Sequence, residues 1–270
     1  MKFTKMQGLG NDYLYVFAAA LPPHVAALTK RLSNRHFGAG ADGMIFILPS
    51  DRADFMMRIF NADGSEAEMC GNGIRCVGKY VYDKGYTDKT RLTVETLAGI
   101  KTLALHVANG SVQTVTVDMG HVTVGAPQTV TAAESAVQLT PVNMGNPHAV
   151  VFVNDAEDAP LATVGAALSV HPAFPGGVNV EFVSVADSTH LRMRVWERGS
   201  GVTLACGTGA CAAVAAAIAA GFCAKNTAVT VMLDGGKLTV QVDENGGVTM
   251  TGPAETVFEG ETDYATECTL

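Results

Sequence analysis

The sequence contains an internal repeat built around two cysteines, and this repeat constrains the fold more than any other feature. Cys70 begins the segment Cys-Gly-Asn-Gly and Cys206 begins Cys-Gly-Thr-Gly, each four or five residues after a Gly-Ser pair. The two cysteines lie half of the 270-residue chain apart. Self-similarity over half a chain predicts two domains of related structure, each contributing one thiol to a shared site.

The repeat extends upstream of the cysteines. Three pairs of segments match: residues 57–65 with 193–200, 11–17 with 146–152, and 40–42 with 177–179. We therefore predict an N-terminal domain over residues 1–119 plus about 260–270, and a C-terminal domain over 120–259. Residues 122–139 are rich in Thr, Val, Ala and Pro, which suggests that the chain crosses between the domains there.

Each cysteine precedes a predicted helix followed by hairpins. The helices run from Gly71 to about Lys84 and from Gly207 to about Ala220, and each is followed by a glycine suited to a helix C-terminus. Asn109-Gly110 between two apolar strands is a strong hairpin signal. The sequence thus predicts an α+β fold of two pseudo-symmetric domains, each a curved mixed or antiparallel β-sheet wrapped around a central α-helix.

Bulk properties exclude several classes of partner. The formal net charge is −8 and there is no run of Lys or Arg, which argues against nucleic acid and anionic membranes as partners. No signal-like stretch opens the chain, and the longest apolar run, 212–220, is about half the length of a membrane-spanning helix. We expect a cytoplasmic protein whose six cysteines are reduced.

The position of the two cysteines suggests reactive thiols. Unpaired N–H groups at a helix N-terminus favour an anion, and thiol pKa values there fall from about 8.5 toward about 3.5 to 7.5. The adjacent glycines let main-chain N–H groups approach a carboxylate closely. Inversion at a carbon needs two opposed bases, so Cys70 and Cys206 are the candidate catalytic pair.

Metal and cofactor chemistry find no support in the sequence. The Cys70/Cys76 and Cys206/Cys211 spacings differ from those of zinc ribbons and fingers. No lysine context for pyridoxal phosphate, dinucleotide-binding fingerprint or Walker loop is apparent. We expect neither a cofactor nor a metal, and a packing role for Cys76 and Cys211.

Polar residues near the cysteines could bind an amino acid. Asn61 and Glu197 occupy matching positions in the two halves, and Arg198 follows Glu197. Glu and Arg beside a thiol could pair with an amino group and a carboxylate, although a partly exposed ion pair between them is an alternative. Four asparagines could orient a zwitterion, but each taken singly fits a turn or cap equally well: Asn11, Asn72, Asn146 and Asn179.

His148 breaks the symmetry of the repeat, because its counterpart is Tyr13. Beside a thiol it could accept a proton or orient the thiol, and alone it would be a core histidine. The two halves of the repeat therefore differ chemically, which suits a substrate that is itself asymmetric.

At these residues the chain closely resembles the diaminopimelate epimerase family, almost from end to end. The motifs that carry the resemblance are 5–12, 60–65, 70–76, 144–148, 178–179, 197–199 and 205–209. The resemblance implies isomerase activity without pyridoxal phosphate, interconverting LL- and meso-diaminopimelate in lysine and peptidoglycan-precursor synthesis. It implies a small amino-acid substrate and a homodimer.

The resemblance also implies roles for individual residues. Cys70 and Cys206 would be the thiolate and thiol on opposite faces of the α-carbon, assisted by His148 and Glu197. The substrate would be bound by Asn11, Asn61, Asn146, Asn179, Glu197 and Arg198, with its carboxylate held by main-chain groups at Gly71-Asn72 and Gly207-Thr208. The chain departs from the family at Gln7, where many members have His, and at Gly43, where some have a substrate-contacting Gln.

Two alternative functions stay open on the sequence. A racemase of the same fold could act on histidine, proline or hydroxyproline, although Arg198 with Asn61 and Asn179 favours a substrate with a second amino-acid group. A thiol switch or amino-acid-binding protein would bind its ligand without exchanging the α-proton.

Overall fold

The computed structural model describes residues 1–263, and the chain divides into two units. Of the described residues, the Cys70 unit comprises Met1–Val117 and 252–263, and the Cys206 unit comprises Asp118–Thr251. The chain passes between them within β8 (Ser111–His121) and again within β18 (Gly247–Pro253). No helix among the described residues is long and apolar enough to cross a membrane.

The first observed boundary, after Val117, lies within two residues of the predicted one, but the crossing segment and the return differ from the prediction. Residues 128–139 are not a crossing: they belong to an antiparallel hairpin within the Cys206 unit. The chain returns to the Cys70 unit at Gly252 rather than near residue 260, and part of the predicted return, 264–270, lies outside the described residues. Both crossings fall inside continuous strands, so no turn residue marks them in the sequence.

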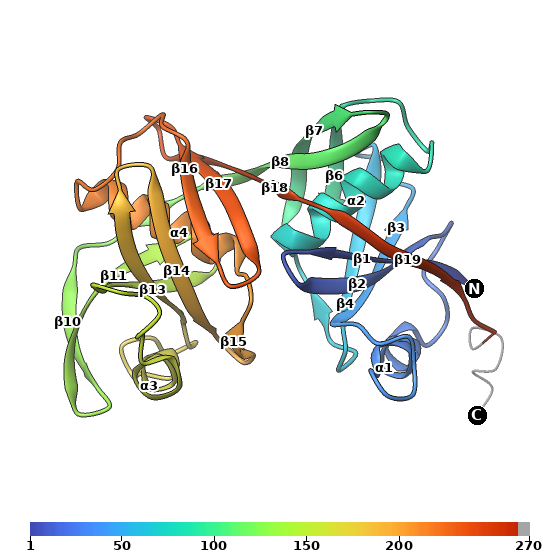
Figure 1. Ribbon diagram of the computed structural model, residues 1–270. Helices are drawn as coiled ribbons and strands as arrows, with labels where there is room; N and C mark the ends of the chain where they lie inside the picture. Colours follow the sequence, from blue (N-terminus) through green and yellow to red (C-terminus); the bar gives the residue numbers. More distant parts are fainter. Residues whose placement is uncertain (264–270) are drawn as a thin grey trace. The chain divides into compact units, whose positions relative to one another are not determined.

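The Cys70 unit is built on one curved sheet (Figure 1). Its strands follow the order β19-β1-β2-β3-β4-β6-β7-β8, and the short β5 pairs with the second half of β4. The β2–β3 and β4–β6 pairs are parallel and the others antiparallel. Besides β8, its strands are β1 (Lys2–Gly8), β2 (Asn11–Phe17), β3 (Gly43–Leu48), β4 (Phe55–Asn61), β5 (Glu66–Ala67), β6 (Arg91–Thr96), β7 (Gly99–Ala108) and β19 (Glu255–Glu261).

The Cys206 unit repeats this connectivity. Its strands follow the order β11-β12-β13-β14-β16-β17-β18, with β9 and β10 on β11 and β15 on β14. The parallel pairs, β12–β13 and β14–β16, fall at the same places in the order. The strands are β9 (Thr123–Val124), β10 (Gln128–Ala132), β11 (Ser135–Asn143), β12 (Pro147–Phe152), β13 (Asn179–Asp187), β14 (His190–Glu197), β15 (Gly201–Thr203), β16 (Val229–Leu233) and β17 (Gly236–Val242).

Each unit has a helix at its first parallel crossover. Parallel neighbours cannot be joined by a tight turn, so β2 reaches β3 through α1 (Val25–Ser33). In the other unit, β12 reaches β13 through η1 (Leu161–Gly165) and α3 (Ala166–Ser169). These short helices, which the topology requires, were not predicted from the sequence.

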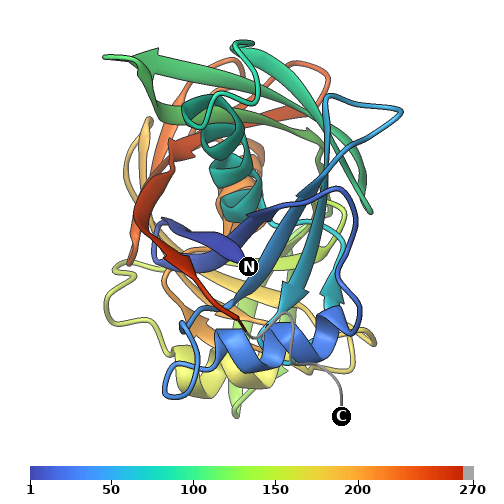
Figure 2. The same ribbon diagram turned by 90° about the vertical axis from the view of Figure 1, so that its right-hand side faces the viewer.

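The two predicted helices are confirmed. α2 spans Gly71–Asp83 and α4 spans Gly207–Ala219, and the glycines that follow, Gly85 and Gly221, have φ of 74° and 80°. Strands curve around α2, which packs on β1, β2 and β7 (Figure 2). The alanine-rich α4 packs on strands β11 to β14 and on β17. Both helices are buried over most of their length, as enclosure by a sheet requires.

The hairpin between β7 and β8 is also confirmed. Asn109 and Gly110 have φ of 53° and 77°, the left-handed conformation that a type I′ turn requires at both central positions.

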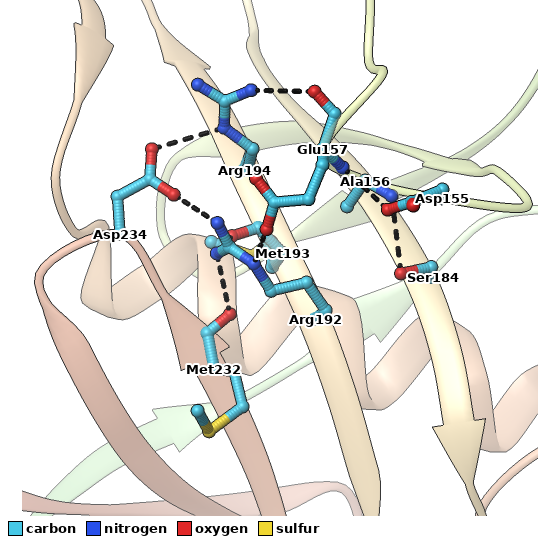
Figure 3. A network of polar contacts seen from close by, with 9 residues as sticks. All are labelled: Asp155, Ala156, Glu157, Ser184, Arg192, Met193, Arg194, Met232 and Asp234. Carbon is cyan, nitrogen blue, oxygen red and sulfur yellow. Dashed lines mark hydrogen bonds and ion pairs between the residues drawn. The ribbon is translucent and has the colours of Figure 1, made fainter.

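A network of arginines and carboxylates fastens two loops to β14 (Figure 3). Arg192 pairs with Asp234 in the β16–β17 turn and, at 2.7 Å, with Glu157 in the loop after β12. Arg194 pairs with Asp234 at 3.2 Å and donates to the carbonyl of Glu157 at 3.1 Å. The same strand ends at Glu197, a candidate site residue, so the network stabilises the strand that carries it.

We predict that Asp234→Asn lowers the free energy of unfolding by about 1 kcal/mol at neutral pH, since a mostly buried charged network is weakened. Burial raises the pKa of Asp234, but hydrogen bonds from Arg192 and Arg194 outweigh it and hold the pKa below 3.8. The contribution is therefore complete above pH 3.8 and is lost as the pH falls through the lower folded pKa.

Urea denaturation of wild type and variant at several pH values measures this difference. Glu244→Gln is the control, because its pairing with Lys225 is at 4.0 Å between exposed side chains, and it should change stability by less than about 0.5 kcal/mol. Equal effects of the two substitutions would contradict the prediction.

Candidate active site

Both candidate cysteines cap a buried helix, as predicted. Cys70 precedes α2 with φ −136° and ψ 117°, and Cys206 precedes α4 with φ −119° and ψ 112°. Extended dihedrals are typical of an N-cap residue and aim the side chain at the first N–H groups of the helix. Cys70 is partly exposed, whereas Cys206 is buried.

The Cys70 thiol lies between the first turn of α2 and Asn11. Its Sγ accepts the Gly73 N–H at 3.3 Å and donates to Asn11 Oδ1 at 3.3 Å. Asn11 Nδ2 in turn donates to Asp42 Oδ2 at 2.8 Å, which fixes the amide with its oxygen toward sulfur. Burial and the nearby Cys70 raise the pKa of Tyr13, which keeps this phenol neutral.

The other predicted site residues of the Cys70 unit lie at the end of β4 and in the first turn of α2. Asn61 closes its own turn, donating from its main chain to the Ser65 carbonyl at 2.8 Å and from Nδ2 to Ser65 Oγ at 3.1 Å. Gly71 and Asn72 are buried in the first turn of α2. Arg75, fully buried, donates to the carbonyls of Gly71 and Pro253 at 3.2 and 3.0 Å and so ties this turn to β18.

The Cys206 unit gathers five predicted residues into one polar cluster. Glu197, at the end of β14, lies near the Cys206 thiol and accepts from Thr203 Oγ1. Thr208 Oγ1 lies 3.7 Å from Cys206 Sγ and accepts from Asn146 Nδ2 at 3.2 Å. His148 Nε2 lies 3.0 Å from Asn146 Oδ1.

Sequence analysis missed a sixth member, Glu181. Its Oε1 lies 2.7 Å from His148 Nδ1, and both side chains are fully buried. The first turn of α4 packs closely against this carboxylate: a Cβ added at Gly209 would lie only 2.7 Å from Glu181 Oε1. The sequence did contain a signal for Glu181, because it is the single charged residue in the largely apolar segment 178–185. A charge inside a buried strand needs a partner.

The prediction of a lowered thiol pKa is wrong for Cys206 in this structure. Burial, followed by the carboxylates of Glu197 and Glu181, raises the pKa of Cys206 well above 9. Hydrogen bonds from Thr208 and the Gly209 N–H oppose this but do not outweigh it. Burial, opposed by Thr203 and reinforced by Glu181, also raises the pKa of Glu197. Cys206 is therefore a thiol at neutral pH.

Arg198 and Asn179 form a separate part of the same unit. Asn179 Oδ1 accepts the Arg198 main-chain N–H at 2.9 Å, and its Nδ2 donates to the Pro147 carbonyl at 3.2 Å. The exposed Arg198 side chain donates to the Gly176 carbonyl at 2.8 Å. Within residues 1–263 it makes no ion pair, so the alternative of a Glu197–Arg198 pair is wrong, and the guanidinium has donors left for an anion.

Strand register corrects one part of the repeat alignment. Tyr13 lies opposite Gly43 in β2–β3, and His148 lies opposite Asn179 in β12–β13, so Asn179 matches Gly43 and not Asp42. A Cβ at Gly43 would lie 2.1 Å from the Phe60 carbonyl oxygen. A larger residue therefore cannot fit here, which explains the departure from the family at Gly43. At the other departure, Gln7 Oε1 accepts from the Gly10 N–H at 2.8 Å and supports the turn before Asn11.

No group of three or more His, Cys, Asp or Glu residues in the described part of the chain is arranged to hold a metal ion.

We predict that Glu197→Gln lowers the pH at which Cys206 reacts with iodoacetamide, because the substitution removes a negative charge that raises the thiol pKa. Peptide mapping after alkylation at a series of pH values measures the shift. The profile of Cys70 in the same samples is the internal control. An unchanged or raised midpoint for Cys206 would count against this electrostatic description.

Comparison with known proteins gives the family of this chain. The family model described as "Diaminopimelate epimerase" matches residues 3–125 and 140–257. A diaminopimelate epimerase of Methanococcus maripaludis is 50% identical over 97% of this chain and 100% of its own length. One from Acetivibrio thermocellus is 51% identical over 97% of this chain and 99% of its own length.

Solved structures share the fold at low sequence identity. A PhzF-family phenazine biosynthesis protein of Bacillus anthracis has a TM-score of 0.77 at 16% identity, covering 97% of this chain and 98% of its own. A hydroxyproline epimerase of Agrobacterium vitis has a TM-score of 0.71 at 20% identity, covering 97% and 90%. These likenesses confirm the predicted fold class, and the family match confirms the resemblance seen in the sequence: the chain belongs to the diaminopimelate epimerase family.

Proposed function

We propose that this protein interconverts LL- and meso-diaminopimelate without a cofactor, using Cys70 and Cys206 as its two bases. The observation that carries the proposal is the equivalent placement of the two thiols, each capping an enclosed helix in a member of this family. The reaction requires both sulfurs to reach the same α-carbon from opposite faces.

In the proposed reaction, one thiolate removes the α-proton and the opposite thiol returns a proton to the other face. Negative charge then develops on the substrate carboxylate, and main-chain N–H groups at the start of each helix, at Gly71-Asn72 and Gly207-Thr208, would stabilise it. The raised pKa of Cys206 supports a starting form in which Cys206 is the proton donor and Cys70 the base.

The residues that differ between the two halves of the repeat would select the substrate. The exposed guanidinium of Arg198 suits a distal carboxylate, and Asn61 and Asn179 could bind the distal amino group. Glu197, which lies near Cys206, could bind the amino group at the reacting carbon. Asn11 and Asn146 lie next to the thiols through the contacts described above and would orient the reacting end.

We further propose that the protein acts as a homodimer in the cytoplasm, in lysine and peptidoglycan-precursor synthesis. The six cysteines are few and widely spaced for a chain of this length, which supports a reducing compartment.

Single substitutions test the two-base mechanism. We predict that Cys70→Ser and Cys206→Ser each lower the rate of LL-to-meso conversion by at least about 1,000-fold, since a serine hydroxyl is a far weaker acid and base than a thiol. The assay follows conversion and deuterium incorporation at the α-carbon in deuterated water, without added cofactor. Wild-type conversion by either variant would eliminate the mechanism.

Arg198→Lys tests the distal contact. We predict that KM for diaminopimelate rises about 10-fold or more with a smaller change in kcat, because a lysine cannot reproduce the planar donor pair of guanidinium. Arg52→Lys is the control, since Arg52 pairs with Glu95 at 3.1 Å as an exposed side chain. Equal KM values for the two variants would remove Arg198 from substrate binding.

A further inference from the structure

Glu181 and His148 form a buried hydrogen-bonded pair, and the family resemblance assigns a role to His148 but none to Glu181. Neither side chain is exposed, and Glu181 Oε1 lies 2.7 Å from His148 Nδ1. Glu181 Oε2 has no hydrogen-bond partner among the described residues. A carboxylate buried in this way is very costly unless a positive charge compensates it, and His148 is the group in hydrogen-bond contact with it.

A series of polar contacts connects His148 of this pair to the Cys206 sulfur. With Nδ1 facing a carboxylate and Nε2 facing Asn146 Oδ1, both ring nitrogens of His148 face acceptors, a geometry that suits a ring donating from both nitrogens. Asn146, with its oxygen occupied, donates through Nδ2 to Thr208 Oγ1. The Thr208 hydroxyl already accepts at its oxygen, so its own proton is available to the sulfur 3.7 Å away.

We propose that Glu181 is a positioning residue for Cys206: it keeps His148 a double donor, and the chain His148–Asn146–Thr208 thereby presents a hydroxyl proton to the sulfur. Glu181 touches neither the thiol nor the substrate in this role. The inference deepens the proposed function, because it rests on Cys206 acting as a base for one stereoisomer.

The charges around this chain explain why such support is needed. Glu197 on β14 and Glu181 on β13 both disfavour a thiolate at Cys206, and Glu197 also interacts with His148. In this proposal an imidazolium at His148 would cancel the charge of Glu181, and the Thr208 donor would stabilise the sulfur anion directly. Without the hydrogen-bond chain, Cys206 would reach the thiolate form, which it needs in order to act as the base, only at high pH.

The test compares the alkylation of Cys206 in Glu181→Met and Glu181→Gln with that in wild type. We predict that Glu181→Met raises the pH midpoint of Cys206 alkylation by about one unit, since the sulfur loses its oriented donor. Glu181→Gln should raise it less, because an amide can still hydrogen-bond to Nδ1. The opposite shift is expected if Glu181 is only a nearby negative charge, since its removal would then lower the midpoint.

Thr208 provides the link between the two ends of the chain. Thr208→Val should raise the midpoint as much as Glu181→Met, and the double variant should add nothing further, because both remove the same donor. Thr208→Ser, which keeps the hydroxyl, should retain the wild-type midpoint. Additive shifts would show that Glu181 does not act through Thr208.

Internal controls separate this result from misfolding and from a failure of the proposed reaction. Cys211 is fully buried in α4, so its continued resistance to alkylation reports that the Cys206 unit stays folded. Glu244→Met removes an exposed charge from the same unit and should leave the midpoint unchanged. A lowered or unaltered midpoint in folded Glu181→Met overturns the inference, whatever substrate the enzyme accepts, because alkylation needs no substrate.

Discussion

The enclosure of a helix by a curved sheet is the constraint on which the whole structure depends. A helix surrounded by strands has a buried N-terminus, and the N–H groups of its first turn then need partners from the protein or from a ligand. In each unit a cysteine occupies the capping position, followed at once by glycines. The same turn therefore holds a thiol and leaves main-chain donors for a carboxylate.

Around this shared arrangement the two units differ in charge. Cys70 contacts the amide of Asn11 and lies near the neutral phenol of Tyr13. Cys206 has the carboxylates of Glu197 and Glu181 near it, and burial makes their effects stronger. The two thiols therefore lie in different electrostatic environments, although their backbones are equivalent. A reaction that needs one thiolate and one thiol benefits from that inequality.

The strands that carry the site residues are supported from outside the site. The network of Arg192, Arg194 and Asp234 stabilises β14, which ends at Glu197. Arg75 links the first turn of α2 to β18, and Gln7 supports the turn before Asn11. Residues that never meet a substrate thus decide where the binding groups lie.

The sequence by itself determined the duplication, the two central helices, the Asn109-Gly110 turn and the cysteine pair, because each depends on residues close together in the chain or on a repeated motif. It also identified Asn146, His148, Glu197 and Thr208, whose motifs lie beside the repeat. Only the tertiary structure decided the partners of those residues. The His148–Glu181 pair and the match of Gly43 with Asn179 arise from strand register, and the crossings lie within strands that carry no turn signal. The raised pKa of Cys206 likewise comes from burial beside carboxylates on two other strands, which outweighs the local effect of the helix N-terminus.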